Sequence, residues 1–201
     1  MLRIVKRAVI VSAFLWVMVA WGFTFLLLGL AQLLFPFQAN GSVVQFHGHP
    51  VASAHVGQNF ATSLRYFWGR PSATVSPTTG KPDPYDALNS GPSNLGPTNA
   101  ALLQQIQAAV ARYLATTPGL RVHEIPISLV ESSGSGLDPD ITLQSALIQI
   151  PRVAKYTGIS PHVLRRLVYQ AARGPELGLF GVERVNVVQL NVSLAKLLRH
   201  S

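Results

Sequence analysis

The chain has 201 residues, of which 48% are hydrophobic and only 12% are charged, with a formal net charge of +8 and a mean hydropathy of +0.30. Soluble domains carry about 25% charged residues, so this composition indicates a part that lies in lipid and excludes an intrinsically disordered chain. The sequence contains no cysteine, which excludes disulfides, cysteine-ligated zinc and thiol catalysis.

The first expected element is a membrane helix. No Asp, Glu, Lys, Arg or His occurs between Ala8 and Phe35, and this run of roughly 28 residues would form a helix about 42 Å long, against a hydrocarbon core of about 30 Å. Because the run exceeds the apolar region of a signal peptide and no Ala-x-Ala site follows, we expect a retained anchor. Arg3, Lys6 and Arg7 precede the run, which orients the N-terminus inward. The expected division is a cytoplasmic N-terminus (1–7), a transmembrane helix (8–35) and an extracytoplasmic domain (36–201).

A hairpin, a loop and a helix are expected next. Residues 43–53 have the pattern of two short strands. Residues 69–97 are rich in Gly, Pro, Ser, Thr and Asn, which predicts a long loop, ordered or flexible. Apolar residues then recur at a spacing of three to four, which predicts a helix capped by Asn99 and ended by Pro118. Residues 124–131 are apolar and partly β-branched, so we expect a buried strand there.

The C-terminal part predicts further helices and a last strand. Thr142 opens a helix that restarts at Pro151, and Ser160 caps the next one. Residues 185–190 are typical of a strand, and Asn191 is expected to cap a short terminal helix. Helices and strands follow no regular βαβ rhythm. The expected fold class is therefore α+β, or α/β with a small sheet, with one N-terminal transmembrane helix and a single extracytoplasmic domain.

Nucleotide hydrolysis by a phosphate loop is excluded, and a serine nucleophile is weakly indicated. The only Gly-Lys pair, Gly80-Lys81, lacks the upstream glycine of such a loop. Ser133 and Ser135 alternate with glycines but do not form the Gly-x-Ser-x-Gly order. A membrane-anchored extracytoplasmic serine hydrolase is kept as the alternative function.

Two clusters are candidates for metal binding. His47, His49 and His55 form either a metal site or a turn with histidines facing solvent. Asp138 and Asp140 either contact a cation or complement the dipole of the helix that follows them.

Aromatic and basic side chains meet between Arg65 and Arg70. Stacking on nucleic acid is one interpretation, but an extracytoplasmic domain meets no such target. A contact for a partner protein and packing in the core both remain open. The excess of basic residues adds a third function class, a module that binds an anionic lipid or polymer and is sensitive to salt.

Several stretches spread over the chain occur together in one protein family. They are residues 35–42 (FPFQANGS), 57–60 (GQNF), 67–73 (FWGRPSA), 90–95 (SGPSNL), 135–138 (SGLD) with Ile141, 149–154 (QIPRVA), and 185–187 (VNV) with Leu190 and Asn191. In their order and spacing, and in the single N-terminal helix, the chain resembles from end to end the C subunit of the Kdp-type potassium-transporting P-type ATPase of bacteria.

The resemblance implies an accessory subunit, without catalysis of its own, in an ATP-driven high-affinity potassium importer of the bacterial inner membrane. The implied partners are a potassium-channel-like subunit, a P-type ATPase subunit, a small single-helix subunit and the lipid bilayer, with no nucleic acid. The implied role is to assemble or stabilise the complex and to act as a catalytic chaperone that raises the ATP affinity of the ATPase subunit. No cofactor, metal or catalytic residue is expected on this chain, while the complex uses ATP and potassium.

The resemblance also implies a nucleotide contact at Gln149, which follows a Ser/Gly-rich loop; a structural role near Pro151 is the alternative. An outer domain does not reach cytoplasmic ATP, so we expect any effect on ATP affinity to pass through the membrane helices, as a coupling free energy of roughly 1–3 kcal/mol. The expected subunit contacts are small residues of the membrane helix and aromatic or polar residues after it: Gly22, Thr24, Gly29, Gln58, Phe60, Tyr66, Trp68 and Arg70.

Overall fold

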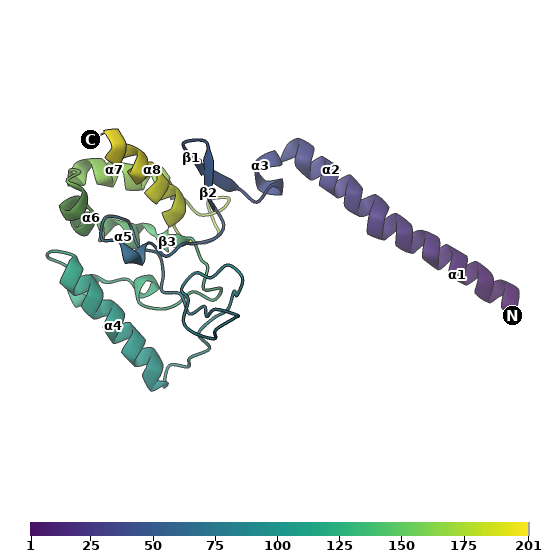
Figure 1. The fold of residues 1–201 in the computed structure, drawn as a ribbon, viewed down its shortest axis with the longest axis horizontal. Coiled ribbons are helices and arrows are strands. Elements are labelled where there is room, and N and C mark those ends of the chain that lie inside the picture. The colour runs from purple at the N-terminus through teal and green to yellow at the C-terminus, as the bar shows by residue number, and fades with distance from the viewer. Residues whose placement is uncertain (201) are drawn as a thin grey trace. The chain divides into compact units, whose positions relative to one another are not determined.

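The long N-terminal helix and the folded remainder of the chain form two separate units, Met1–Val43 and Val44–Ser201. The computed structural model describes residues 1–200, and the side chains of residues 1–199 (Figure 1).

The first unit is an apolar helix followed by a short turn. Three segments run on without a break: α1 (Leu2–Val17), a π-helical segment (Met18–Phe23) and α2 (Thr24–Leu34). Together they form the one helix among the described residues that is long and apolar enough to cross a membrane, with a mean hydropathy of 2.2 over an 18-residue window. This confirms the expected N-terminal apolar helix, while the boundaries of the crossing within it stay a prediction.

The end of the helix is folded tightly. Pro36 begins the short helix α3 (Pro36–Ala39) at a position where its missing N–H breaks no helical hydrogen bond. The Asn40 side chain donates to the Pro36 carbonyl at 2.7 Å and to Gln32 Oε1 at 3.0 Å. These two hydrogen bonds hold the segment after α2 folded back against the end of that helix.

The second unit opens with the expected hairpin. β1 (Val43–Phe46) and β2 (His49–Ser53) form a two-stranded sheet. His47 and Gly48 connect them with positive φ angles of 54° and 78°, which is the backbone that a two-residue hairpin turn needs to match the twist of its strands.

A small antiparallel sheet and four helices form the centre of this unit. β3 (Asp140–Thr142), β5 (Arg184–Asn186) and β4 (Ala172–Arg173) pair in that order. The helices are α5 (Leu143–Leu147), α6 (Ile150–Thr157), α7 (Pro161–Ala171) and α8 (Val187–His200). Their buried side chains form one core with those of the strands, including Ile141, Val153, Leu164, Val168, Val185, Leu190 and Leu194. The mixture of helices and small sheets confirms the expected α+β class.

Three helix starts lie where the sequence predicts them. Asn99 Oδ1 accepts from the Ala101 N–H at 2.9 Å and caps α4 (Ala100–Thr116). The Thr142 hydroxyl accepts at the start of α5, and the Ser160 hydroxyl accepts at the start of α7. These caps are predictable because donor and acceptor are neighbours in the sequence.

The expected strand over 124–131 is wrong. That stretch contains two 3₁₀ turns, Val122–Glu124 and Ile127–Leu129. Pro126 has no N–H to give to a neighbouring strand, and its carbonyl instead accepts from the Leu129 N–H at 3.0 Å. Leu129 and Val130 are buried while Ile127 is exposed. The segment therefore packs part of its apolar side chains into the folded unit without joining a sheet.

The expected strand over 185–190 is wrong beyond Asn186, where α8 begins. Val187, Leu190 and Leu194 are buried at helical spacing. Asn186 Oδ1 accepts from the Gln189 N–H at 3.0 Å and so caps the helix. Asn191, the expected cap, lies inside α8.

The long loop over 69–97 packs against the rest of the unit. The Thr74 hydroxyl donates to the Asp83 carbonyl at 2.6 Å, and the Tyr85 hydroxyl donates to the Arg70 carbonyl at 2.5 Å. The Ser90 hydroxyl donates to the Ser135 carbonyl at 3.0 Å, which joins the far end of the loop to another segment. The structure therefore selects the ordered alternative for this loop.

Two glycines allow the Tyr85 ring to lie against the backbone. A Cβ atom on Gly57 would lie 2.4 Å from Tyr85 Cε1 and 2.8 Å from the Asp138 carbonyl oxygen. A Cβ atom on Gly69 would lie 2.5 Å from the Tyr85 hydroxyl. Gly57 and Gly69 lie in two of the stretches on which the resemblance rests, and the close approach of Tyr85 gives a physical reason for a glycine at each position.

We expect Gly57→Ala to lower the free energy of unfolding by about 1–3 kcal/mol, because the added methyl group overlaps both a ring and a backbone carbonyl. Denaturant unfolding of the detergent-solubilised chain, followed by tryptophan fluorescence, measures the change. Gly96→Ala is the matched control, since a Cβ atom there meets nothing within 4 Å. Equal midpoints for the two variants would show that the Tyr85 contact is not a constraint.

Candidate functional site

The site is built around a buried segment that is neither helix nor strand. Phe67 and Trp68 are 0% and 2% exposed, and their backbone has no strand partner. Buried N–H and C=O groups need hydrogen bonds, so other parts of the chain have to supply them. Three side chains do so: one just before α6, one in α6 and one in α8.

Gln149, the residue just before α6, pairs with the backbone of Trp68. Its Oε1 accepts from the Trp68 N–H at 2.7 Å, and its Nε2 donates to the Trp68 carbonyl at 3.1 Å. Nε2 also donates to the Ser145 carbonyl at 3.0 Å. The Gln149 side chain is fully buried, so its amide replaces the neighbouring strand that this backbone lacks.

Asn191 does the same for Phe67. Its Oδ1 accepts from the Phe67 N–H at 2.9 Å, and its Nδ2 donates to the Phe67 carbonyl at 2.8 Å. The residue lies one turn into α8 and is 2% exposed. Two amide side chains, one just before α6 and one in α8, thus bond to the backbone of two consecutive residues.

Arg152 of α6 completes the arrangement. Its Nη1 donates to the carbonyls of Leu64 and Tyr66 at 2.7 and 2.9 Å, and its Nη2 donates to Gln149 Oε1 at 2.6 Å. Burial lowers the pKa of its guanidinium to about 10, while the nearby Tyr113 opposes the shift. The group therefore stays charged at neutral pH although it is fully buried.

The Trp68 ring lies among cations and another ring. The guanidinium carbons of Arg152 and Arg112 lie 3.9 and 4.2 Å from its centroid, distances at which cation–π attraction acts. Its indole N–H donates to the Ser63 carbonyl at 2.7 Å, and the Tyr113 ring is 5.4 Å away. Arg112 and Tyr113 belong to α4, so Trp68 links that helix to α6. Burial raises the pKa of the Tyr113 phenol above its usual value.

The expected subunit contacts after the membrane helix lie at two separate hollows. Gln58, Phe60 and Tyr66 line a hollow of about 190 Å³ beside the hairpin and α8. Trp68 and Arg70 line another of about 490 Å³ between the long loop and α4. Tyr66 and Arg70 are partly exposed, whereas Phe67 and Trp68 belong to the core. Of the two interpretations of this stretch, packing in the core is therefore the one that applies to Phe67 and Trp68.

The expected contacts in the membrane helix belong to the first unit. Gly22 lies in the π-helical segment, Thr24 begins α2, and Gly29 follows in α2. A Cβ atom on either glycine would meet nothing within 4 Å. The helix surface at both positions is open to a partner in the bilayer.

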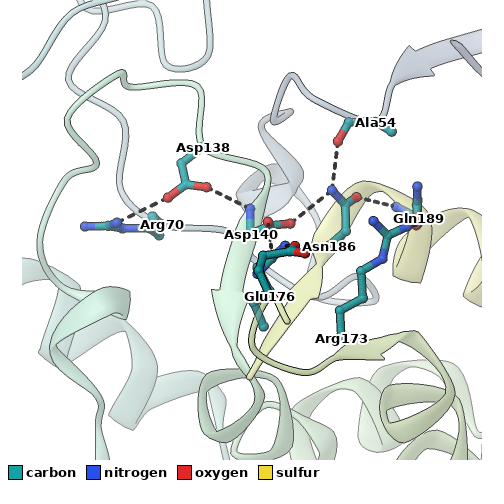
Figure 2. A network of polar contacts seen from close by, with 9 residues as sticks. Ala54, Arg70, Asp138, Asp140, Arg173, Glu176, Asn186 and Gln189 are labelled. Carbon is teal, nitrogen blue, oxygen red and sulfur yellow. Dashed lines mark hydrogen bonds and ion pairs between the residues drawn. The ribbon is translucent and has the colours of Figure 1, made fainter. Parts of the chain in front are cut away.

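Asp138 and Asp140 are tied to protein groups (Figure 2). Asp138 forms an ion pair with Arg70 at 3.2 Å and accepts from the Asp140 N–H at 3.0 Å. Asp140 pairs with Arg184 at 3.3 Å and accepts from Asn186 Nδ2 at 3.1 Å. Residues 1–199 contain no cluster of three or more potential metal-binding side chains, and His47, His49 and His55 are exposed.

The arrangement around the serines does not favour a hydrolase. Ser133 is 3% exposed, and its N–H donates to the Pro71 carbonyl at 3.2 Å. The Ser135 hydroxyl accepts from the Leu137 N–H at 3.1 Å. Neither hydroxyl bonds to a histidine among the described side chains, so the general base that activates a serine nucleophile is not in place.

Sequence reasoning missed the roles of Arg152 and Asn191. A charged residue inside the apolar stretch 149–154 was a usable signal, because buried charges require partners. Asn191 carried a misleading signal, since asparagine is a common helix cap. Gln149 was identified, and the structure shows it in contact with backbone.

Comparison with known proteins matches most of the chain to one family. The family model described as "K+-transporting ATPase, c chain" (KdpC) matches residues 5–196. Proteins named potassium-transporting ATPase KdpC subunit are similar throughout. The one from Methylobacterium nodulans is 44% identical over 98% of both chains, that from Rhodopseudomonas palustris 44% over 96% of this chain and 97% of its own, and that from Caldanaerobacter subterraneus 40% over 94% and 93%.

We expect Gln149→Leu to lower the free energy of unfolding by about 2–5 kcal/mol, because it leaves the Trp68 peptide groups and one Arg152 N–H buried without partners. Gln149→Glu keeps the acceptor and loses the two donated bonds, so a smaller loss is expected. Denaturant unfolding of the detergent-solubilised chain measures both. Gln144→Leu, at an exposed glutamine of α5, is the control; if it costs as much as Gln149→Leu, the pairing has no special weight.

Proposed function

The chain belongs to the KdpC family, the c chain of K+-transporting ATPases, and from that premise we propose that it is a non-catalytic subunit that assembles and stabilises the transporter. Its place as a potassium-transport subunit with one candidate membrane-spanning helix follows from the family and the fold. The observation that carries the accessory role is that the match covers the helix and the folded unit together. In the folded unit, the buried polar side chains Gln149, Arg152 and Asn191 bond to backbone of the unit itself.

We propose that the partners are a potassium-channel-like subunit, a P-type ATPase subunit and a small single-helix subunit. The open helix surface at Gly22, Thr24 and Gly29 supports a contact within the bilayer, where small residues allow close helix approach. The hollow lined by Gln58, Phe60 and Tyr66, and the one next to Arg70, support contacts outside it.

The chaperone role is proposed as an indirect one. The Gln149 amide is fully buried, and each of its polar atoms is engaged twice. A direct nucleotide contact there stays a prediction that would require these bonds to open. We favour an effect of the folded unit on ATP affinity that passes through the membrane helices as a coupling free energy of about 1–3 kcal/mol, a factor of about 5–150 in affinity.

We further propose that the N-terminus is cytoplasmic and the folded unit lies outside the inner membrane. Arg3, Lys6 and Arg7 precede the apolar helix, and positive charge is retained on the inner side.

The absence of native cysteine allows a direct test of this orientation. In sealed spheroplasts, we expect a membrane-impermeant maleimide to label Leu88→Cys and to label Leu2→Cys only after the membrane is opened. The two positions are equally exposed, at 86% each. The reverse pattern would invert the topology.

Assembly is tested by purifying C-terminally tagged chain in mild detergent from potassium-limited cells that express the whole set of subunits. We expect a P-type ATPase and a polytopic potassium-channel-like protein to be retained, no ATP hydrolysis by the chain alone, and loss of high-affinity uptake when the chain is deleted.

Gly22→Leu should reduce the retention of these partners, because the larger side chain holds helices apart. Normal uptake in the deletion strain would refute the role.

A further inference from the structure

The loop between β4 and β5 presents apolar side chains to solvent. Leu177, Leu179, Phe180 and Val182 are 87%, 80%, 66% and 65% exposed. Single exposed apolar residues are normal, but a contiguous group of large ones marks a surface that another molecule covers. Outside the N-terminal helix, the described chain has no other stretch in which four such residues lie so close in sequence.

The loop has a defined backbone that turns these side chains outward. The Glu176 N–H donates to the Phe180 carbonyl at 2.8 Å, and the Phe180 N–H donates back to the Glu176 carbonyl at 3.0 Å. Leu177 and Gly178 take positive φ angles of 54° and 73° inside this closed turn. A non-glycine residue in that region costs energy and marks a constrained turn.

Ion pairs fix the base of the loop to the sheet. Arg184, at its C-terminal end, contacts both Glu176 and Asp140. Two residues further, the Asn186 side chain donates to the Ala54 carbonyl at 2.8 Å, in the network shown in Figure 2. Because Ala54 directly follows β2, the base of the loop is joined to the hairpin.

The hairpin at that junction is the first element after the short segment that follows the membrane helix in the sequence. The first residue of β1 and the last of β2 lie at the same end of a hairpin. Roughly eight residues, 35–42, separate α2 from β1, which span at most about 30 Å when extended. Through the Asn186–Ala54 hydrogen bond, the base of the loop is therefore linked to the first element of the folded unit that follows the membrane helix along the chain.

The charges of the loop favour a protein over lipid as its partner. Residues 174–183 contain Glu176 and Glu183 and no Lys, Arg, Trp or Tyr. Anionic lipid surfaces attract basic residues, and Trp and Tyr are the residues typical of the membrane interface. Apolar side chains with a polar rim are instead the arrangement of a protein interface. The exposed Glu183 carboxylate forms no ion pair with the described side chains.

We propose that residues 174–183 are a docking loop that inserts Leu177, Leu179 and Phe180 into an apolar hollow on a membrane-embedded partner subunit. The hollow has basic or N–H groups at its edge that meet Glu183. This inference rests on the proposed function and adds a surface that was not among the expected subunit contacts.

The test uses the full-length tagged chain expressed with the other subunits. We expect Leu179→Asp to lower partner recovery at least about tenfold, the change seen when a contact near the centre of an interface is lost. Leu88→Asp, which places the same charge at a leucine of another loop that is also at least 80% exposed, should leave recovery unchanged. Equal recovery for both variants, with the wild-type level retained, would overturn the docking loop while leaving the proposed function intact. Failure of the wild-type chain to retain partners would refute the proposed function instead.

A photoreactive residue identifies the partner independently of folding effects. Phe180→p-benzoylphenylalanine replaces one exposed aromatic with another, and we expect its adduct after irradiation to contain a partner subunit. Adducts only with lipid, only with a second copy of this chain, or with nothing would each overturn the proposal.

Discussion

The folded unit depends on buried hydrogen bonds that side chains make to an irregular backbone. Gln149 and Asn191 each give one of two consecutive residues an acceptor for its N–H and a donor for its C=O. Arg152 donates to the carbonyls of Leu64 and Tyr66 just before them. A net hydrogen bond contributes only about 1 kcal/mol, but a buried group left without one costs about 1–3 kcal/mol. The main effect of this set is therefore that the buried N–H and C=O groups of Phe67 and Trp68 are not left without a partner, and the small gain from each hydrogen bond matters less.

This pairing of side chains with backbone explains why so little regular sheet is enough for the unit. The three strands of the sheet, β3, β5 and β4, are two or three residues long. Strands in globular proteins are usually longer. Aromatic residues 67 and 68 are buried next to the helices and contribute large apolar surfaces to the core. Side-chain amides on α6 and α8 allow that burial without a neighbouring strand. The long loop adds a second layer, since the Tyr85 ring lies against glycine backbone.

Local signals made part of the structure predictable. The caps at Asn99, Thr142 and Ser160 bond to N–H groups two or three residues away, and the apolar helix at the N-terminus follows from composition alone. Residues 185–190 misled because β-branched residues in a short apolar run fit a strand and a buried helix equally well. The partners of Gln149 and Asn191 lie 81 and 124 residues away in the sequence, and the docking loop stands out only when exposure is measured. No local pattern in the sequence indicates which distant residues pair or which apolar side chains stay exposed.

The distant pairing of Phe67 with Asn191 has a consequence for how the protein is made. Asn191 lies within the last helix, so the buried N–H and C=O groups of Phe67 have no side-chain partner until synthesis is nearly complete. The membrane helix, which leaves the ribosome first, has no such dependence. Contacts between residues far apart in sequence slow folding and leave apolar segments open to aggregation in the meantime. The nascent chain is thus anchored early and folded late, and a ribosome that stops short of α8 releases a membrane-bound segment whose aromatic residues stay uncovered.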